Sequence, residues 1–218
     1  LDDRVLCDYQ VVAEPSEIPR LTLALQFLTK GSDFGGAATG IDIFARLAVA
    51  LNAISPVDVR IIITDASSDT DPAIIPKWAA KAGLTIRPEQ IERVSSAQDT
   101  IRVRPSEVFF TQIWWNMINF GKVRHTQAQL FGTRPQPIIR LAQDYEPGWL
   151  EFSSAHMLAR SAYDDSGPLW GIVNSSSLAR YIDLMGHTFE RRFVFEPVIV
   201  EALRPYLKQL GTSQREKR

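Results

Sequence analysis

Two carboxylates and a phenol stand next to one another in the sequence Asp144-Tyr145-Glu146. They follow an apolar run of strand type, residues 137–142, and Pro147-Gly148 ends any regular structure directly after them. On an extended backbone, Asp144 and Glu146 lie on one side and Tyr145 on the other. A carboxylate in a cleft can take a proton from a sugar hydroxyl, or hold that hydroxyl by hydrogen bonds. Asp144 and Glu146 are therefore the candidate catalytic residues, and Tyr145 is a candidate substrate contact.

A structural role stays open for these acids, because carboxylates at strand ends often cap a neighbouring helix or pair with arginine. Asp65, at the end of another predicted strand, is a weaker case of the same kind. The three histidines lack the spacing of a metal site, and we expect no bound metal. His156 is the one histidine that we would test as a base, since it follows the acids closely.

Aromatic and amide side chains supply further candidates for substrate binding. Trp115 and Trp149 can stack on a sugar ring, because an aromatic face suits a surface rich in C–H groups. Packing in the core is the alternative for such tryptophans. Asn174 lies at the end of a predicted strand that leads into a helix, where it can bind a ligand or cap that helix.

A loop of small residues, 31–40, lies between a predicted strand and a predicted helix. Gly35 and Gly36 would let the backbone approach a ligand, and the helix N-terminus would favour an anionic group. We expect Thr39 to cap this helix, with Asp42 completing a capping box. The glycine spacing matches neither the dinucleotide fingerprint nor the P-loop, so the loop predicts no ATP or dinucleotide site. A tight turn with close packing is the structural alternative.

The elements that must position these residues alternate between strand and helix. Strands are expected at residues 4–12, 21–28, 57–65, 108–112, 137–142, 169–174 and 192–195, and helices at 39–51, 72–82, 114–123, 155–163, 175–184 and 198–210. Residues 84–104 give no clear assignment. About six strands that alternate with helices predict an α/β fold, a three-layer, Rossmann-like, doubly wound domain with a mainly parallel sheet.

Composition narrows the class of protein. A formal net charge of -1 over 218 residues argues against nucleic acid as the main partner. The single cysteine, Cys7, excludes an intrachain disulfide and suits a cytoplasmic location. No apolar run reaches the roughly 18 residues that a transmembrane segment needs. The chain starts at Leu1 and ends in charged residues, so we expect it to be a fragment of a longer protein.

The chain resembles the rhamnosyltransferases that build bacterial surface polysaccharides, which are two-domain enzymes of the GT-B type. The resemblance rests on Gly35-Gly36 with Thr39, on Gln-Asp-Tyr-Glu-Pro at residues 143–147 followed by an aromatic and Ser153-Ser154, and on the turn Val173-Asn174-Ser175-Ser176. It implies that residues 1–218 form a single, acceptor-side domain. A second domain would then bind most of the nucleotide-sugar donor.

The resemblance also implies a reaction. A deoxyhexose, expected to be rhamnose, would pass from dTDP-rhamnose to a hydroxyl of a growing glycan, with Asp144 or Glu146 as the base. Gly35 and Gly36 would lie close to the sugar and phosphate of the donor, and no further cofactor is expected. The enzyme would work in the cytoplasm, peripheral to the inner face of the membrane. By the same reasoning, the isolated chain is expected to have little or no transferase activity.

Two other functions remain open from the sequence. The chain could be a non-catalytic α/β module that binds a ligand or a protein, with its acids as caps and its aromatics in the core. It could also be a different α/β enzyme, such as one that modifies nucleotide-sugars within one domain. The second of these predicts a complete nucleotide site, which the glycine loop does not supply.

Overall fold

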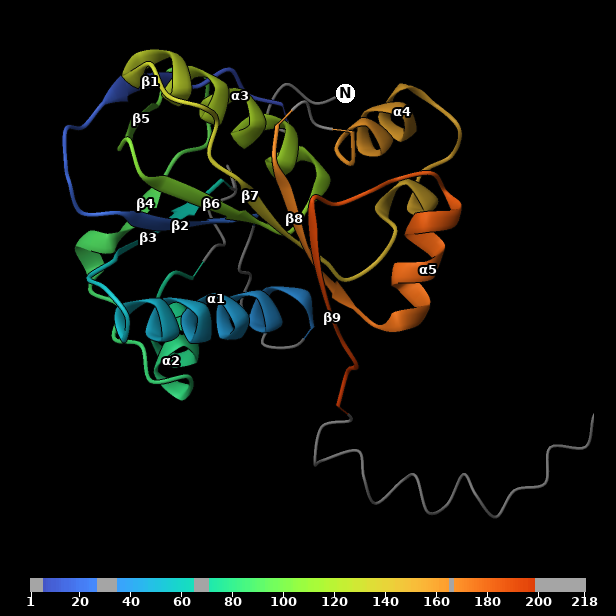
Figure 1. Cartoon of the computed structure of the whole chain (residues 1–218), viewed down its shortest axis with the longest axis horizontal. Coiled ribbons are helices and arrows are strands. Elements are labelled where there is room, and N and C mark those ends of the chain that lie inside the picture. The colour runs from blue at the N-terminus through green and yellow to red at the C-terminus, as the bar shows by residue number, and fades with distance from the viewer. Residues whose placement is uncertain (1–5, 27–34, 65–70, 165–166, 199–218) are drawn as a thin grey trace, which may run out of the picture.

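The computed structural model describes residues 6–26, 35–64, 71–164 and 167–198 (Figure 1). Seven strands in this part of the chain form one sheet, in which every neighbouring pair is parallel. From one edge to the other they are β4 (Ile91–Arg93), β3 (Asp58–Ile63), β2 (Arg20–Leu25), β6 (Glu107–Thr111), β7 (Ile138–Ala142), β8 (Leu169–Asn174) and β9 (Arg191–Phe195). Parallel pairing requires crossover connections, and the helices supply them.

Helices cover both faces of this sheet, which gives three layers (Figure 1). One face carries α1 (Gly36–Asn52) and α2 (Ile74–Lys81), and the other carries α3 (Trp114–Phe131), α4 (Ser154–Ser161) and α5 (Ser176–Leu184). A small parallel sheet of β1 (Gln10–Ala13) and β5 (Thr100–Val103) packs beside α3. Two short 3₁₀ helices, η1 (Pro88–Gln90) and η2 (Glu146–Trp149), complete the described elements.

The alternation of side chains along the strands divides the core between the two faces. In β2, Leu21, Leu23 and Leu25 pack under α1, whereas Ala24 faces α3. In β7, Leu141 packs on the α1 side and Ile138 on the α3 side. Burial of both faces explains why these strands are largely apolar in the sequence.

The order of the strands places a switch point between β2 and β6. From β2 the chain builds outward through β3 to β4, and from β6 it builds in the opposite direction to β9. In doubly wound sheets, the crevice at the carboxyl ends of the strands beside such a switch point is where ligands bind. The α/β class and the doubly wound parallel sheet expected from the sequence are thus confirmed.

Several local expectations need correction. Thr39 is not the cap of α1, because Gly35 adopts a φ of 88° and lets the helix begin at Gly36. The Thr39 hydroxyl instead donates to the carbonyl of Gly35 from within the first turn. The first strand is shorter than expected, since β1 begins at Gln10, and it belongs to the small sheet. The unassigned stretch 84–104 contains η1, β4 and β5.

Some expectations fall on residues that the structure does not describe. These are Asp65, residues 31–34 of the glycine loop, the ends of two expected strands, and most of the expected helix over 198–210. In the described part, no helix has both the length and the apolar character needed to cross a bilayer.

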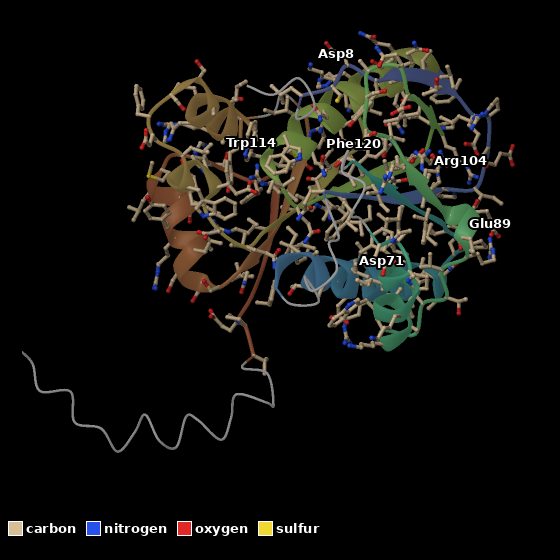
Figure 2. The ribbon with its side chains drawn as sticks, turned by 180° about the vertical axis from the view of Figure 1, so that it is seen from behind. Asp8, Asp71, Glu89, Arg104, Trp114 and Phe120 are labelled. Carbon is tan, nitrogen blue, oxygen red and sulfur yellow. The ribbon has the colours of Figure 1, made fainter. Side chains whose placement is uncertain are left out.

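A buried network of charges lies at the amino ends of the central strands. Glu107 is fully buried, and its carboxylate accepts hydrogen bonds from Arg20 at 2.7 Å and Arg60 at 2.5 Å. Figure 2 shows Arg104, which lies near this network, well separated from Trp114 at the start of α3. This network therefore satisfies buried charges far from the crevice where a ligand is expected.

Candidate active site at the carboxyl ends of the strands

A pocket of about 410 Å³ opens at the carboxyl ends of β2, β6, β7 and β8, beside the start of α1. Seven of the nine site residues expected from the sequence line it: Gly35, Gly36, Thr39, Asp144, Glu146, Trp149 and Asn174. Its described lining also includes Gln26, Gln112, Ile113 and Gln143. The fold thus brings together, at its switch point, segments that are far apart in the sequence.

Glu146 is a buried carboxylate at the start of η2, and it is only 5% exposed. It accepts a hydrogen bond of 2.6 Å from Arg140, which is itself fully buried, and another from the backbone N–H of Trp114. Burial raises the pKa of Glu146 to about 7, although Arg140 and the Trp114 N–H both act to lower it. The carboxyl group can therefore gain or lose a proton near neutral pH.

Asp144 lies at the exposed mouth of the pocket, in the turn between β7 and η2. One of its carboxylate oxygens accepts from the backbone N–H of Tyr145 at 2.7 Å, and the other from the indole N–H of Trp149 at 3.0 Å. The Trp149 ring is thus held in place by a polar bond while its side chain stays 59% exposed. A fixed and exposed aromatic ring beside a carboxylate is suited to stacking on a sugar.

β7 ends at Ala142, before Asp144 and Glu146. The two acids therefore do not lie on an extended strand, which was the reason to expect them on one side. Both nevertheless reach the pocket, because the turn and η2 redirect the chain. Glu146 also makes the contacts expected of a purely structural acid, since it pairs with Arg140 and bonds to the N-terminus of α3. A carboxylate has about four acceptor positions, so these contacts leave room for a ligand hydroxyl.

Tyr145 does not line the pocket in the described structure; it points into the core instead. Its hydroxyl lies 3.0 Å from Nε2 of buried His187, whose Nδ1 lies 2.9 Å from the Asp164 carboxylate. Because a carboxylate only accepts, Nδ1 carries a proton, and in the neutral imidazole Nε2 then accepts from the phenol. Tyr145 thereby anchors the turn that carries both acids. The hydroxyl of Tyr163 adds a bond of 3.3 Å to the Asp144 carbonyl.

Trp115 also lies away from the pocket lining. It packs at the edge of the core on the α3 face and contacts Trp114 edge-on, with ring centroids 5.5 Å apart. Its expected contact with a sugar therefore has no support in the pocket geometry. The aromatic ring that the fold does bring to the pocket is that of Trp149.

The two glycines at the start of α1 bring the helix close to the pocket floor. The side-chain amide of Gln112 donates to the carbonyl of Gly36 at 2.7 Å, and a Cβ added at Gly36 would lie 2.9 Å from Oε1 of Gln143. In the described structure, the first turn of α1 has neither an acidic residue nor a side-chain cap. The partial positive charge of this helix end is therefore available to a ligand.

Four amides line the pocket, and we call them the amide row: Gln26, Gln112, Gln143 and Asn174. Sequence reasoning named Asn174 as a candidate contact but missed the three glutamines. Each glutamine directly follows the last residue of β2, β6 or β7, and Asn174 is the last residue of β8. These four strands are neighbours in the sheet, so the amides meet in one place. A glutamine at or near the carboxyl end of each of three predicted strands was the signal that could have revealed these three residues.

Three of these amides keep a buried side-chain oxygen that has no hydrogen-bond partner within the described part of the chain. They are Oε1 of Gln26, Oε1 of Gln112 and Oδ1 of Asn174. Buried polar atoms are normally paired, so three such oxygens around one pocket call for a ligand or water.

The turn after Asn174 is held in a strained conformation. Ser175 has a φ of 103°, and it is the one non-glycine residue with positive φ in the described ranges. Its N–H donates to the carbonyl of Phe195 at 2.8 Å, and its hydroxyl caps α5. Strain of this kind persists where the surroundings impose it and is concentrated at functional sites. Here it fixes Asn174 at the pocket.

The pocket contains oxygen acceptors and an aromatic ring, but the described residues contain no cluster of three or more His, Cys, Asp or Glu side chains that could hold a metal ion.

Comparison with protein families gives a match to the family described as WsaF, N-terminal domain, over residues 20–176. No curated protein matches the chain at a significant level. The matched range runs from the first residue of β2 to the first residue of α5, and it includes the pocket. The chain therefore belongs to the WsaF N-terminal domain family, which supports a function as the N-terminal domain of a glycosyltransferase.

Proposed function

We propose that the chain is the acceptor-binding domain of a GT-B glycosyltransferase that adds a deoxyhexose, rhamnose, to a growing cell-surface glycan. The observation that carries this proposal is the convergence of two carboxylates, an exposed tryptophan and four amides in one pocket at the switch point. Carboxylates and amides bind sugar hydroxyls, and an aromatic face packs against the sugar ring. The family match supports the same class of enzyme.

The acceptor hydroxyl would react beside Asp144 or Glu146. As its oxygen bonds to the anomeric carbon of the donor, the bond from that carbon to the diphosphate breaks, and the carboxylate takes the hydroxyl proton. With a pKa of about 7, Glu146 is half ionised near neutral pH, so a rate that depends on it would rise as the pH passes through 7. The pH profile therefore helps to distinguish the two candidates.

The donor would be dTDP-rhamnose, held mainly by a second domain. The available N-terminus of α1 would face its diphosphate, because the helix dipole favours the negative charge that develops on the leaving group. Gly35 and Gly36 allow this approach, since neither places a side chain at the start of the helix. We place the reaction in the cytoplasm, at the inner face of the membrane.

The test uses the full-length enzyme with dTDP-rhamnose and a glycan acceptor. At least one of Asp144→Asn and Glu146→Gln should lower kcat by about 100-fold or more, the range for loss of a general base. Glu151→Gln is a matched control, because this exposed acid is near both residues in sequence and does not line the pocket. Circular dichroism would show that each variant is folded. Turnover that is unchanged in both variants would refute the catalytic assignment.

A non-catalytic binding module is the second candidate, and the contacts of Glu146 with Arg140 and the N-terminus of α3 favour it. It predicts that both variants keep full turnover, and that Glu146→Gln acts on stability alone. The two proposals therefore give opposite results in the same assay. For the isolated chain we predict little or no turnover of a dTDP-sugar, because the donor would lack most of its binding site.

A further inference from the structure

We infer that the amide row reads free hydroxyl groups of the bound sugar as hydrogen-bond donors, with Gln26, Gln112 and Asn174 as specificity-determining residues. This inference rests on the proposed function, because it takes the occupant of the pocket to be a sugar. It adds the chemical requirement that the occupant must meet: unsubstituted hydroxyls at the positions that face the amides.

The direction of the hydrogen bonds follows from the partners already in place. The amide nitrogen of Gln112 donates to the carbonyl of Gly36 at 2.7 Å and to Oε1 of Gln143 at 3.3 Å. Both of its N–H groups are thus used, while its Oε1 has no partner in the described structure. Gln112 is only 6% exposed, so this oxygen is not compensated by bulk water. Oε1 of Gln112 is therefore left to accept a hydrogen bond from a bound ligand.

The hydrogen bonds of its amide nitrogen fix the orientation of the Gln112 amide. A Cβ added at Gly40 would lie 2.1 Å from Nε2 and 2.5 Å from Oε1 of Gln112, which shows how tightly α1 covers this amide. A reversed amide would present its oxygen to the carbonyl of Gly36 and lose that bond. The site is therefore preorganised to accept, and not to donate, at this position.

Gln26 and Asn174 extend the same chemistry to both sides of Gln112. Each has a buried oxygen without a partner in the described part of the chain, and each follows or ends a strand that adjoins the pocket. The carboxylates of Asp144 and Glu146 add further acceptors to the same lining. An occupant that supplies several donors matches this set, and a sugar with free hydroxyls does so.

The energetic consequence is selection against a sugar whose hydroxyl is missing or capped. A deoxy or O-methyl group leaves a buried acceptor unpaired, and such sites reject the analogue strongly. We expect about tenfold or more weaker binding for each hydroxyl that is read, because an unpaired buried acceptor costs about that factor in affinity. An O-methyl ether still accepts hydrogen bonds but cannot donate, and a deoxy group adds no bulk, so weaker binding of both derivatives identifies the donor role.

A hard cation is the competing occupant, because amide and carboxylate oxygens also bind Ca²⁺ or Mg²⁺. It needs no hydroxyl groups and would bind without any sugar. Both ions therefore serve as separate ligands in the titration, in the absence of glycoside.

The test is an NMR titration of the full chain, labelled with ¹⁵N, with methyl α-L-rhamnopyranoside, methyl α-D-glucopyranoside and their mono-O-methyl and monodeoxy derivatives. We expect at least one parent glycoside to shift the side-chain amide signals of the row. At least one of its derivatives should bind about tenfold more weakly. Gln26→Met and Asn174→Ala should weaken the parent and reduce this discrimination, whereas Gln129→Met, an exposed change on α3, should alter neither.

The possible outcomes separate this inference from the proposed function. Equal binding of parent and derivatives would overturn the inference and leave the proposed function standing. Absence of binding by every glycoside would overturn both. Shifts of the same amide signals with Ca²⁺ or Mg²⁺ alone would assign the oxygens to a cation and also overturn the inference. Backbone spectra of each variant would show that it keeps the native fold.

Discussion

Replacing Glu146 by glutamine should remove a pH dependence from the stability of the protein. Burial raises the pKa of this carboxyl from its ordinary value of 4.5 to about 7 in the folded state. The folded protein then binds the proton more tightly than the unfolded chain does. The stabilisation from this group is fully present below pH 4.5 and is lost as the pH rises through 7.

The size of the effect follows from the two pKa values. At about 1.4 kcal/mol for each pH unit between them, the contribution amounts to about 3 kcal/mol. The Glu146→Gln variant lacks the titrating group, so the difference in unfolding free energy between it and the wild type should change by about this amount between pH 4 and 8. Glu146→Gln also removes the charged partner of Arg140. At high pH it should therefore lower the unfolding free energy by more than a neutral surface substitution does.

Urea denaturation at several pH values measures this difference directly. Asp144→Asn is the control, since this carboxylate lines the same pocket but is exposed. It should retain the pH dependence through neutral pH, with a small reduction because Asp144 helps to raise the pKa of Glu146. Parallel loss of stability in wild type and Glu146→Gln across the whole range would show that burial does not hold the proton on Glu146.

Three further substitutions test other parts of the structure. Glu107→Gln should cost about 3 to 5 kcal/mol in urea denaturation, because it leaves buried arginines without their partner; a loss below about 1 kcal/mol would contradict this. Gly40→Ala should cost about 1 to 3 kcal/mol and weaken glycoside binding, because its Cβ would displace the Gln112 amide; unchanged binding would contradict the role of that amide. Tyr145→Phe should cost about 1 to 3 kcal/mol by leaving His187 without its hydroxyl donor, with glycoside affinity unchanged; a direct substrate contact would instead show as lost affinity.

The sequence predicts the fold well because the central strands are buried on both faces. Long apolar, β-branched runs such as residues 57–65 are typical of strands in that position, and their alternation with helices leads to a parallel sheet. The stretch 84–104 gives no assignment from the sequence because β4 has only three residues and β5 pairs outside the main sheet. Pairing between distant segments decides such short strands, and local pattern does not reveal it.

The candidate site is predictable in part, for a related reason. Strand ends locate the pocket, so Asp144, Glu146 and Asn174 can be found from the sequence. The direction of a side chain in the turn after a strand depends on its tertiary contacts. Sequence position alone therefore suggests Tyr145 as a substrate contact, although it bonds to His187, which follows α5 some 40 residues later in the chain.

The separation between the buried charges at the amino ends and the pocket at the carboxyl ends bears on how this protein can change over time. Substitutions in the turns after the strands alter what the pocket accepts, while the ion pairs of Glu107 are untouched at the far end of the same sheet. Independent sites of this kind contribute nearly additively to stability. Substitutions at the four amides can therefore change the ligand preference of the pocket while the buried charges around Glu107 stay constant.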